Sequence, residues 1–275
     1  SRDWSSDVCS SDLKRYFGNY LSRKILHNFT RFVPRFVRWS YGPVIFDESF
    51  QNEIMDSLAE WLNINKIMFH GTFHPFDKDL IFPPNLNFSK ETVSTFIINL
   101  NDGLDTILKN TDKNSVQKNI KRAENRGVKI TMIKSEEDYS IYYNLQKKYR
   151  SENKLEPYLR GDIYEGYKLL GKIGWDGFLA WFNDEPIGAI SFSHFNGYIH
   201  ESGIARSKTD DFNKLYSQDF LRWNIIEWGI KNNCRYYDFA GVKTQNQTSK
   251  DVGIFFNKKK WGGTLYDYWS FRGKT

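Results

Sequence analysis

Three consecutive lysines beside aromatic residues and a glycine pair stand near the end of the sequence, in the segment FNKKKWGG over residues 256–263. Lysine side chains can hold negative charge or polarise a carbonyl group, and glycines let a ligand approach the backbone closely. We expect a strand over residues 235–242, then a polar loop that carries this segment, then a strand over residues 265–271. A solvated basic turn is the alternative interpretation.

A second group of candidate residues lies in a predicted hairpin. Asn196-Gly197 is typical of a two-residue turn, and it follows a strand-like run over residues 187–195. Such a turn pairs Phe195 with Tyr198. By register it also pairs Ser193 with His200 and Phe192 with Glu201.

Glu201 falls on the apolar side of this hairpin. Alternation places it with Ile190, Phe192 and Ile199, whereas Ser191, Ser193, His200 and Ser202 share the other face. Burial among apolar neighbours would raise the pKa of this carboxyl group, as a general base for an ammonium substrate requires. An exposed sheet edge is the alternative position for Glu201.

A basic helix is predicted over residues 114–126. Asn114 and Gln117 form a capping-box pattern, and Gly127 ends the helix. An inward stripe contains Val116, Ile120 and Ala123, which leaves four cations outside: Lys118, Lys121, Arg122 and Arg126. Between residues 109 and 134 there are eight basic residues against two acidic ones. This face suits phosphate groups, and a merely solvated helix face is the alternative.

Hydrophobic periodicity predicts the elements that position these residues. The helices expected besides the basic one cover residues 48–62, 136–152, 163–170 and 215–232, and the first of these buries Ile54, Leu58 and Leu62. Further strands are expected over residues 42–46, 66–73, 92–100 and 178–182. His70 and His74 are four residues apart, but a structural role fits them better than metal binding, because the context is a strand or loop.

The composition bounds the class of protein. The 275 residues suffice for one large domain or two of ordinary size, and 40% apolar residues allow a real core. A net charge of +6 favours anionic partners, and two cysteines are too few for a disulfide framework. No apolar run approaches the roughly 20 residues of a membrane-spanning helix.

The first part of the chain has two unusual segments. Residues 1–13 show neither helical nor strand periodicity and resemble a translated sequencing adaptor, so we exclude this artefactual head from the fold. Residues 14–38 contain seven basic residues and no acidic one, interleaved with aromatic residues. They suit an anionic membrane surface or nucleic acid, and an ordinary domain edge is the alternative.

Four passages together resemble the FemABX family, whose members transfer amino acids from aminoacyl-tRNA to peptidoglycan precursors. The passages are YGPVI (41–45), TFIINL (95–100), NIKRAENRGV (119–128) and YDFAGV (237–242) with KKKWGG (258–263). The resemblance covers residues 41–271. The family pattern of Phe-Lys followed by Phe-Gly departs here at Asn257 and Trp261, which leaves Lys258 as the match to the lysine.

This resemblance implies an α/β (α+β) fold of two GNAT-like acyltransferase domains, each a mixed, largely antiparallel sheet flanked by helices. We expect the first domain over residues 14–134 and the second over residues 135–275. The resemblance also implies that the protein is an aminoacyltransferase. It would work in the cytoplasm, at the inner face of the membrane. The donor is aminoacyl-tRNA, and the acceptor is an amine on a lipid- or UDP-linked cell-wall precursor. No metal or organic cofactor is required.

The resemblance further suggests roles for individual residues. Lys258 would orient the aminoacyl ester and offset the charge that develops on its oxygen, and Asp238 and Glu201 are candidate bases. Six residues are candidates for substrate binding: Lys118, Arg122, Arg160 and Tyr164, which would hold a diphosphate, and Lys259 and Gly262.

Two other functions are open at this point. An acyl-CoA-dependent GNAT N-acyltransferase acting on a cell-surface polysaccharide precursor would need a glycine-rich turn before a helix, where backbone N–H groups meet the pyrophosphate. The corresponding segment, residues 204–221, contains no glycine, which argues against acyl-CoA. A non-catalytic binder of RNA or anionic membrane is supported by the basic stretches alone.

Overall fold

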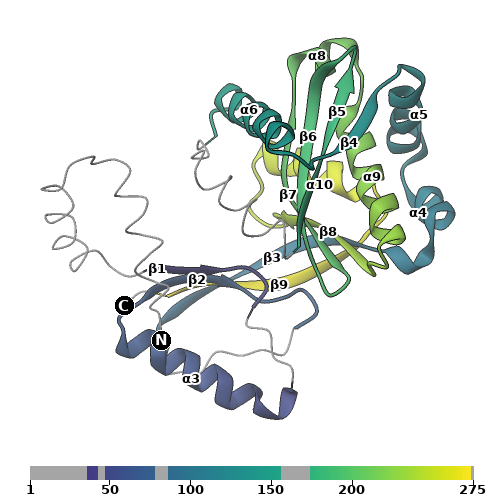
Figure 1. Cartoon of the computed structure of the whole chain (residues 1–275). Coiled ribbons are helices and arrows are strands. Elements are labelled where there is room, and N and C mark those ends of the chain that lie inside the picture. Colours follow the sequence, from purple (N-terminus) through teal and green to yellow (C-terminus); the bar gives the residue numbers. More distant parts are fainter. Residues whose placement is uncertain (1–35, 43–46, 78–85, 156–173, 274–275) are drawn as a thin grey trace, which may run out of the picture. The chain divides into compact units, whose positions relative to one another are not determined.

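The computed structural model describes residues 36–42, 47–77, 86–155 and 174–273 (Figure 1). Its contacts divide the chain into two compact units. Unit 1 comprises Ser1–Thr92 and Tyr268–Thr275, and unit 2 comprises Val93–Asp267. The expected domain boundary between residues 134 and 135 lies inside unit 2 and stays a prediction. The artefactual head, the expected strand over residues 42–46 except Gly42, and the expected helix over residues 163–170 lie outside the described residues.

In the described residues of unit 1, a helix packs against a small sheet. A 3-10 turn (Glu48–Phe50) leads into α3 (Gln51–Ile64), and β1 (Phe36–Trp39) runs parallel to β2 (Met68–Thr72), which pairs antiparallel with β9 (Thr264–Gly273). The expected helix is present. Leu62 is buried as predicted and Leu58 is partly buried, whereas Ile54 is exposed, and Met55 and Ala59 are buried instead. The core against Phe69 and Phe271 selects this neighbouring stripe.

Unit 2 is built on a mixed, largely antiparallel sheet flanked by helices, which confirms the predicted fold class (Figure 1). Its strands are β3 (Phe88–Asn99, of which residues 88–92 belong to unit 1), β4 (Lys129–Met132), β5 (Trp175–Phe182), β6 (Glu185–Phe195), β7 (Tyr198–Arg206) and β8 (Tyr236–Val242). The order is β3-β8-β7-β6-β5-β4, and every neighbouring pair is antiparallel except β7 and β8.

The hairpin between β6 and β7 forms with the predicted register. Asn196 and Gly197 both have positive φ, 46° and 77°, as a tight hairpin turn of the mirror-image type requires. Phe195 lies opposite Tyr198, and the register continues through Ser193 with His200 and Phe192 with Glu201. The local turn signal therefore placed Glu201 correctly.

The basic helix begins differently from the prediction. A 3-10 turn (Leu100–Asp102) and α4 (Leu104–Asn110) precede it, and a π-helical turn (Lys113–Gln117) leads into α5 (Lys118–Asn125). The predicted capping box of Asn114 and Gln117 is wrong. Asp112 is the cap, because its carboxylate accepts a hydrogen bond from the Ser115 N–H at 2.7 Å. Gly127, with φ +81°, ends the helix as predicted.

The described part of unit 2 contains four further helices: α6 (Glu136–Glu152), α8 (Lys208–Asn213), α9 (Ser217–Lys231) and α10 (Ser249–Lys259). The bounds of α6 are those predicted, and α9 confirms the helix expected over residues 215–232. The polar loop expected before the lysines is largely wrong, because α10 occupies most of it. Thr248 and Asp251 form a capping box that starts α10.

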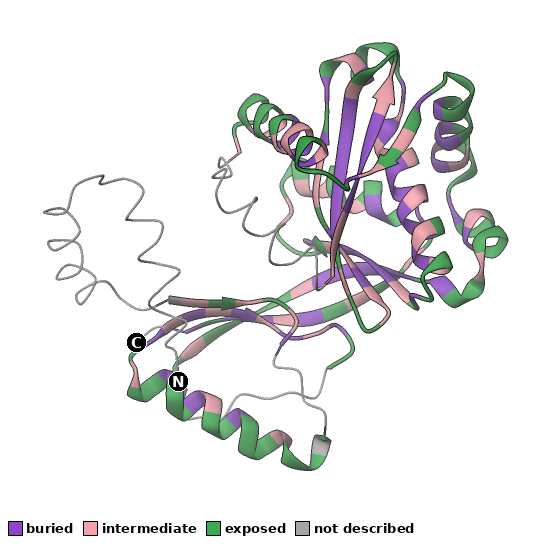
Figure 2. Cartoon of the chain, viewed as in Figure 1, coloured by how far each residue is buried: buried purple, intermediate pink, exposed green. Residues whose placement is uncertain are grey.

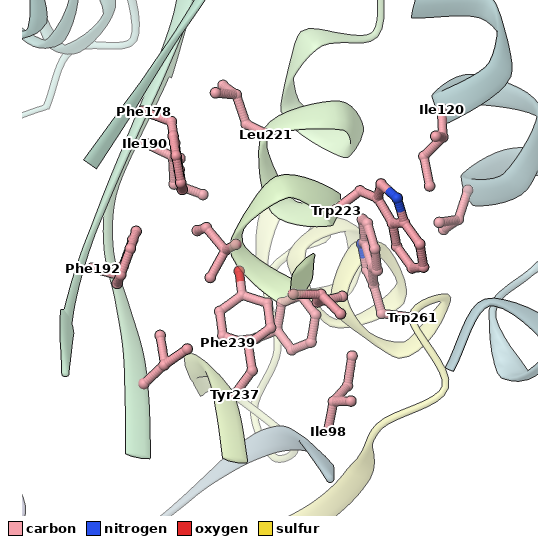
Figure 3. Close-up of a cluster of buried hydrophobic side chains, with 14 of the residues drawn as sticks. Ile98, Ile120, Phe178, Ile190, Phe192, Leu221, Trp223, Tyr237, Phe239 and Trp261 are labelled. Atoms are coloured by element: carbon pink, nitrogen blue, oxygen red, sulfur yellow. The ribbon is translucent and has the colours of Figure 1, made fainter. Parts of the chain in front are cut away.

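The main core of unit 2 lies between the sheet and the helices α9 and α5. Figure 3 shows Tyr237, Phe239 and Trp261 converging on α9, and Trp261 is 1% exposed. On the opposite side of β5, β6 and β7, α6 packs through Tyr139, Tyr142 and other apolar residues (Figure 1). Figure 2 shows the resulting pattern, with buried residues on the strands and on the inward side of each helix.

Candidate active site

The candidate site lies where the parallel strands β7 and β8 stop pairing. Their register runs from Tyr198 opposite Tyr236 to His200 opposite Asp238 and goes no further in the described chain. Both strands continue, to Arg206 and Val242. In α/β sheets ligands bind beyond the carboxyl ends of strands that part in this way.

Each of the two strands carries a bulge just past this point. In β7 the register slips between Ile190 opposite Ile204 and Phe192 opposite Glu201, so Ser202 and Gly203 together oppose one residue of β6. The Ser191 hydroxyl accepts a hydrogen bond from the Gly203 N–H at 3.1 Å, which stabilises the bulge. Bulges of this kind re-aim side chains and are frequent next to active sites.

The bulge in β8 places Phe239 and Ala240 opposite a single residue of β3. Ala240 has φ +62°, a left-handed conformation that costs a non-glycine residue about 1 kcal/mol. The surroundings support it, since the Thr95 hydroxyl shares its one proton between the Ala240 carbonyl, at 2.8 Å, and the Asp238 carboxylate, and the Ala240 N–H donates to the same carboxylate at 2.8 Å. The strain fixes the direction of two consecutive carbonyl groups, those of Ala240 and Gly241.

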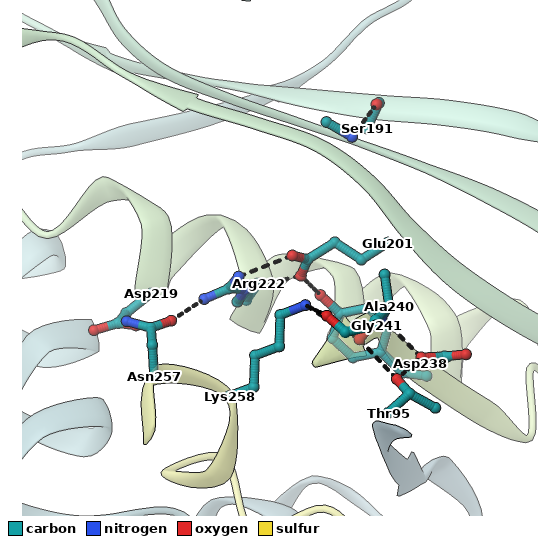
Figure 4. Close-up of polar contacts among 12 residues, drawn as sticks. Thr95, Ser191, Glu201, Asp219, Arg222, Asp238, Ala240, Gly241, Asn257 and Lys258 are labelled. Carbon is teal, nitrogen blue, oxygen red and sulfur yellow. Dashed lines mark hydrogen bonds and ion pairs between the residues drawn. The ribbon is translucent and has the colours of Figure 1, made fainter. Parts of the chain in front are cut away.

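The side chain of Lys258 forms hydrogen bonds with both of these carbonyl groups. It lies in the last turn of α10 and is 9% exposed, and its Nζ donates to the oxygens of Ala240 at 3.1 Å and Gly241 at 3.0 Å (Figure 4). Burial lowers the pKa of Lys258 from 10.5 to about 8, although the nearby carboxylates of Glu201 and Asp238 act in the opposite direction. A solvated basic turn is therefore the wrong description of this lysine, whereas its neighbour Lys259 is exposed.

Glu201 belongs to a buried ion pair beside Lys258. Its two carboxylate oxygens accept from Arg222 Nε and Nη2, each at 2.8 Å, and the Tyr237 hydroxyl donates to the same carboxylate at 2.6 Å. The predicted rise in pKa is wrong. Burial favours it, but Arg222, Lys258 and Tyr237 together hold the pKa of Glu201 below its ordinary value. The exposed-edge alternative is also wrong, because Glu201 is 3% exposed.

Arg222 connects this pair to the helix that carries Lys258. Its Nη1 donates to Asn257 Oδ1 at 2.7 Å, and Figure 4 shows the guanidinium between Glu201 and Asn257. Asn257 is the residue at which the sequence departs from the FemABX pattern. The side chain of Asn257, which stands where the family pattern has phenylalanine, thus provides a hydrogen-bond acceptor next to Lys258.

Asp238 is surrounded by polar groups on the other face of β8. It is fully buried, and besides the Ala240 N–H it accepts hydrogen bonds from the hydroxyls of Thr95 and of Tyr198, the latter at 2.7 Å. His200 lies opposite it in register. Burial lowers the pKa of His200, so this imidazole is neutral at neutral pH.

Among the described residues, three further predicted site residues lie outside this group: Lys118, Arg122 and Gly262. Lys118 and Arg122 are exposed on α5, where Lys118 contacts Asn114 and Arg122 contacts Tyr216. Gly262, with φ +76°, lies so close to α4 that an added Cβ would be 2.4 Å from the Asn110 carbonyl oxygen. Arg160 and Tyr164 lie outside the described residues.

Sequence reasoning missed Arg222, Tyr237 and Thr95 as parts of the site. Arg222 had one detectable signal, because Ile225 and Ile226 follow it by three and four residues on a predicted helix, which places it on an apolar face where an unpaired arginine would be unfavourable. Within the described ranges, no three His, Cys, Asp or Glu side chains come close enough to hold a metal ion. The same ranges contain no helix long and apolar enough to cross a membrane.

A structure of FemX superimposes with a TM-score of 0.63 at 13% identity and covers 84% of this chain and 79% of that one. The chain shares the fold of FemX. The resemblance to FemABX proteins is therefore confirmed for the fold.

Two lysylphosphatidylglycerol synthetase structures are similar to nearly the same degree as FemX. One, a C-terminal domain of a putative synthetase from Agrobacterium fabrum, has a TM-score of 0.62 at 10% identity and covers 86% of this chain and 77% of that one. The other, from Bacillus licheniformis, has a TM-score of 0.62 at 11% identity and covers 88% of this chain and 79% of that one. The sequence itself matches no family model and no curated protein.

Proposed function

We propose that this chain is an aminoacyltransferase that moves an amino acid from aminoacyl-tRNA to an amine on a lipid- or nucleotide-linked peptidoglycan precursor. The observation that carries the proposal is Lys258, a buried lysine held by the bulged carbonyls of β8 where β7 and β8 part. The shared fold with FemX supports the same reaction class. The reaction would take place in the cytoplasm at the inner membrane face.

In this reaction the amine nitrogen attacks the ester carbonyl carbon, and the carbonyl oxygen gains negative charge. The C–O bond to the ribose then breaks, and the proton lost by the amine passes to the ribose oxygen. Below its pKa of about 8, Lys258 is an ammonium group that can donate a hydrogen bond to the developing oxyanion. Such a donor in a dry site contributes about 3 kcal/mol to the barrier reduction.

The carboxylates take different roles. The oxygens of Glu201 are engaged by Arg222 and Tyr237, so we assign Glu201 to fixing the charge around Lys258 instead of to proton transfer. Asp238 also accepts hydrogen bonds, but from two hydroxyls and a backbone N–H and not from a cation, so it remains our candidate base, with His200 opposite it in register. Lys259 and Gly262 remain candidates for substrate binding through their place at the end of α10.

The start of α9 argues against an acyl-CoA donor. A pyrophosphate group would need the backbone N–H groups at the start of this helix. Here the Ser217 N–H donates to the buried carboxylate of Asp210 at 2.9 Å, which puts a negative charge where the phosphate would bind. The absence of glycine in residues 204–221 is consistent with this.

A lipid acceptor is the second candidate, because two lysylphosphatidylglycerol synthetase structures share the fold. Transfer to the headgroup of an anionic lipid would use the same donor and the same Lys258. It differs from the first candidate only in the nucleophile, a hydroxyl in place of an amine.

The test incubates the full chain with radiolabelled aminoacyl-tRNAs or labelled acyl-CoAs, and with a UDP-linked precursor or phosphatidylglycerol vesicles as acceptor. We expect transfer from tRNA to the precursor, lost in Lys258→Ala and retained in Lys250→Ala, which removes an exposed lysine from the same helix. Transfer only from acyl-CoA overturns the proposal. Transfer only to the vesicles replaces the first candidate with the second.

A further inference from the structure

The outer face of α5 carries a row of cations. Lys118, Lys121, Arg122 and Arg126 are all exposed and lie on one side of the helix, since positions four and eight residues apart stack along its axis. The row from residue 118 to residue 126 is about 12 Å long at the helical rise. None of its members forms an ion pair with a carboxylate in the described part of the chain.

The two arginines are nevertheless held in place. The guanidinium of Arg122 lies 5.4 Å from the centre of the Tyr216 ring, and its Nη1 donates to the Tyr216 hydroxyl at 3.3 Å. Arg126 lies 5.9 Å from the same ring, and its Nη1 donates to the carbonyls of Asn213, at 2.8 Å, and Lys214. These contacts use one nitrogen of each guanidinium and leave the other donors of the fork for a ligand.

The turn that holds these arginines is itself strained. Lys214 and Tyr216 both have positive φ, 51° and 58°, and such conformations cluster at binding sites when the surroundings maintain them. Directly before this turn, Phe212 is 87% exposed. Exposed aromatic rings next to arginines are platforms on which nucleic-acid bases stack.

Several features favour an RNA backbone over other anions. The row is much longer than one diphosphate, the group to which Lys118 and Arg122 are assigned from the sequence. A membrane-bound helix needs an apolar face turned outward. The exposed residues of α5 are all polar: Lys118, Lys121, Arg122, Glu124 and Asn125, followed by Arg126.

Hydrogen bonds and an ion pair connect the row of cations to the candidate site within unit 2. Asn119 on α5 donates to Asp219 on α9 at 2.7 Å, and Asp219 also pairs with Lys260 at 2.8 Å. Lys260 is two residues from Lys258, and its carbonyl accepts from the Asp112 N–H at 2.8 Å. Buried contacts thus connect the helix that carries the row to the end of α10.

We infer that α5 and the turn over residues 213–216 bind the phosphate backbone of the RNA that carries the aminoacyl group, with Phe212 stacking on an unpaired base. This inference rests on the proposed function for the identity of the RNA. The binding surface can be tested without any transfer reaction.

The experiment measures binding of a fluorescent acceptor-stem RNA hairpin ending in CCA, by anisotropy at several salt concentrations. We expect Arg122→Ala/Arg126→Ala to weaken binding about tenfold or more, and to lower the slope of log K against log salt by about 1 to 2. Because Arg126 also contacts the 213–216 turn, Lys118→Ala/Lys121→Ala serves as a second pair, whose only described side-chain contact is Lys118 with Asn114. Circular dichroism checks that each variant is folded.

The matched control is Lys147→Ala/Lys148→Ala, which removes two exposed charges from α6. Equal loss of RNA affinity in the control and the α5 variants overturns the inference, because net charge alone would then explain binding. Unchanged RNA binding in the α5 variants overturns it too, whether or not they lose binding to a UDP-linked precursor or to anionic vesicles. If the wild type binds RNA through α5 but transfers nothing, the surface stands and the proposed reaction fails.

Discussion

Replacement of Lys258 by methionine tests the central physical argument, that this lysine is buried at an energetic cost. Methionine has a similar length and no charge. In the folded protein the pKa of Lys258 is about 8, against 10.5 as its ordinary value. At 1.36 kcal/mol for each pKa unit, keeping the ammonium charged in the folded state costs about 3 kcal/mol at neutral pH.

The sign of the pH dependence follows from proton binding. Below pH 8 both folded and unfolded states hold the proton, and the full cost is present. Between about pH 8 and pH 10.5 the folded state has lost the proton and the unfolded state keeps it, so wild-type stability rises with pH. The variant lacks this contribution. Relative to the wild type it is therefore most stable at neutral pH, and the advantage shrinks by about 3 kcal/mol by about pH 10.

The assay is urea unfolding of the wild type and Lys258→Met at a series of pH values from about 7 to 10. The variant also loses two hydrogen bonds, to the Ala240 and Gly241 carbonyls, which subtracts about 1 to 3 kcal/mol at every pH. The slope of the stability difference against pH is therefore the decisive quantity. A flat difference refutes the reasoning. Lys259→Met, which makes the same replacement at an exposed position, is the matched control.

Three further outcomes are expected. Arg222→Leu should reduce the free energy of unfolding by about 3 to 5 kcal/mol, because Glu201 is left buried without its cation. Adding Glu201→Leu should recover most of that loss in urea unfolding, and a double variant as unstable as the single one would contradict the ion-pair argument. Gly262→Ala should lower stability by about 1 to 3 kcal/mol, since a Cβ would meet the Asn110 carbonyl at 2.4 Å, and an unchanged melting temperature would count against it. In transfer assays, Asn257→Ala should reduce kcat more than KM if its contact with Arg222 positions Lys258, whereas Asn257→Asp, which keeps an acceptor, should retain most of the activity.

The amino-acid sequence by itself determined the elements whose signals are local. The Asn196-Gly197 turn set the register that pairs Phe192 with Glu201, because two adjacent residues with positive φ suffice to define the turn. The bounds of α6 and the burial of Val116, Ile120 and Ala123 likewise follow from helical periodicity. Lys258 was also identified from the sequence, by its place in the family pattern.

Only the tertiary structure decided what surrounds these residues. Glu201 is ionised because Arg222, 21 residues further along the chain, meets it inside the protein. Lys258 is buried because α10 packs its last turn against the bulge at Ala240. No pattern in the neighbouring sequence predicts this contact. The physical reason is that the pKa of a buried group depends on charges and dipoles brought from distant segments, whereas turns and helices depend on residues only a few positions apart.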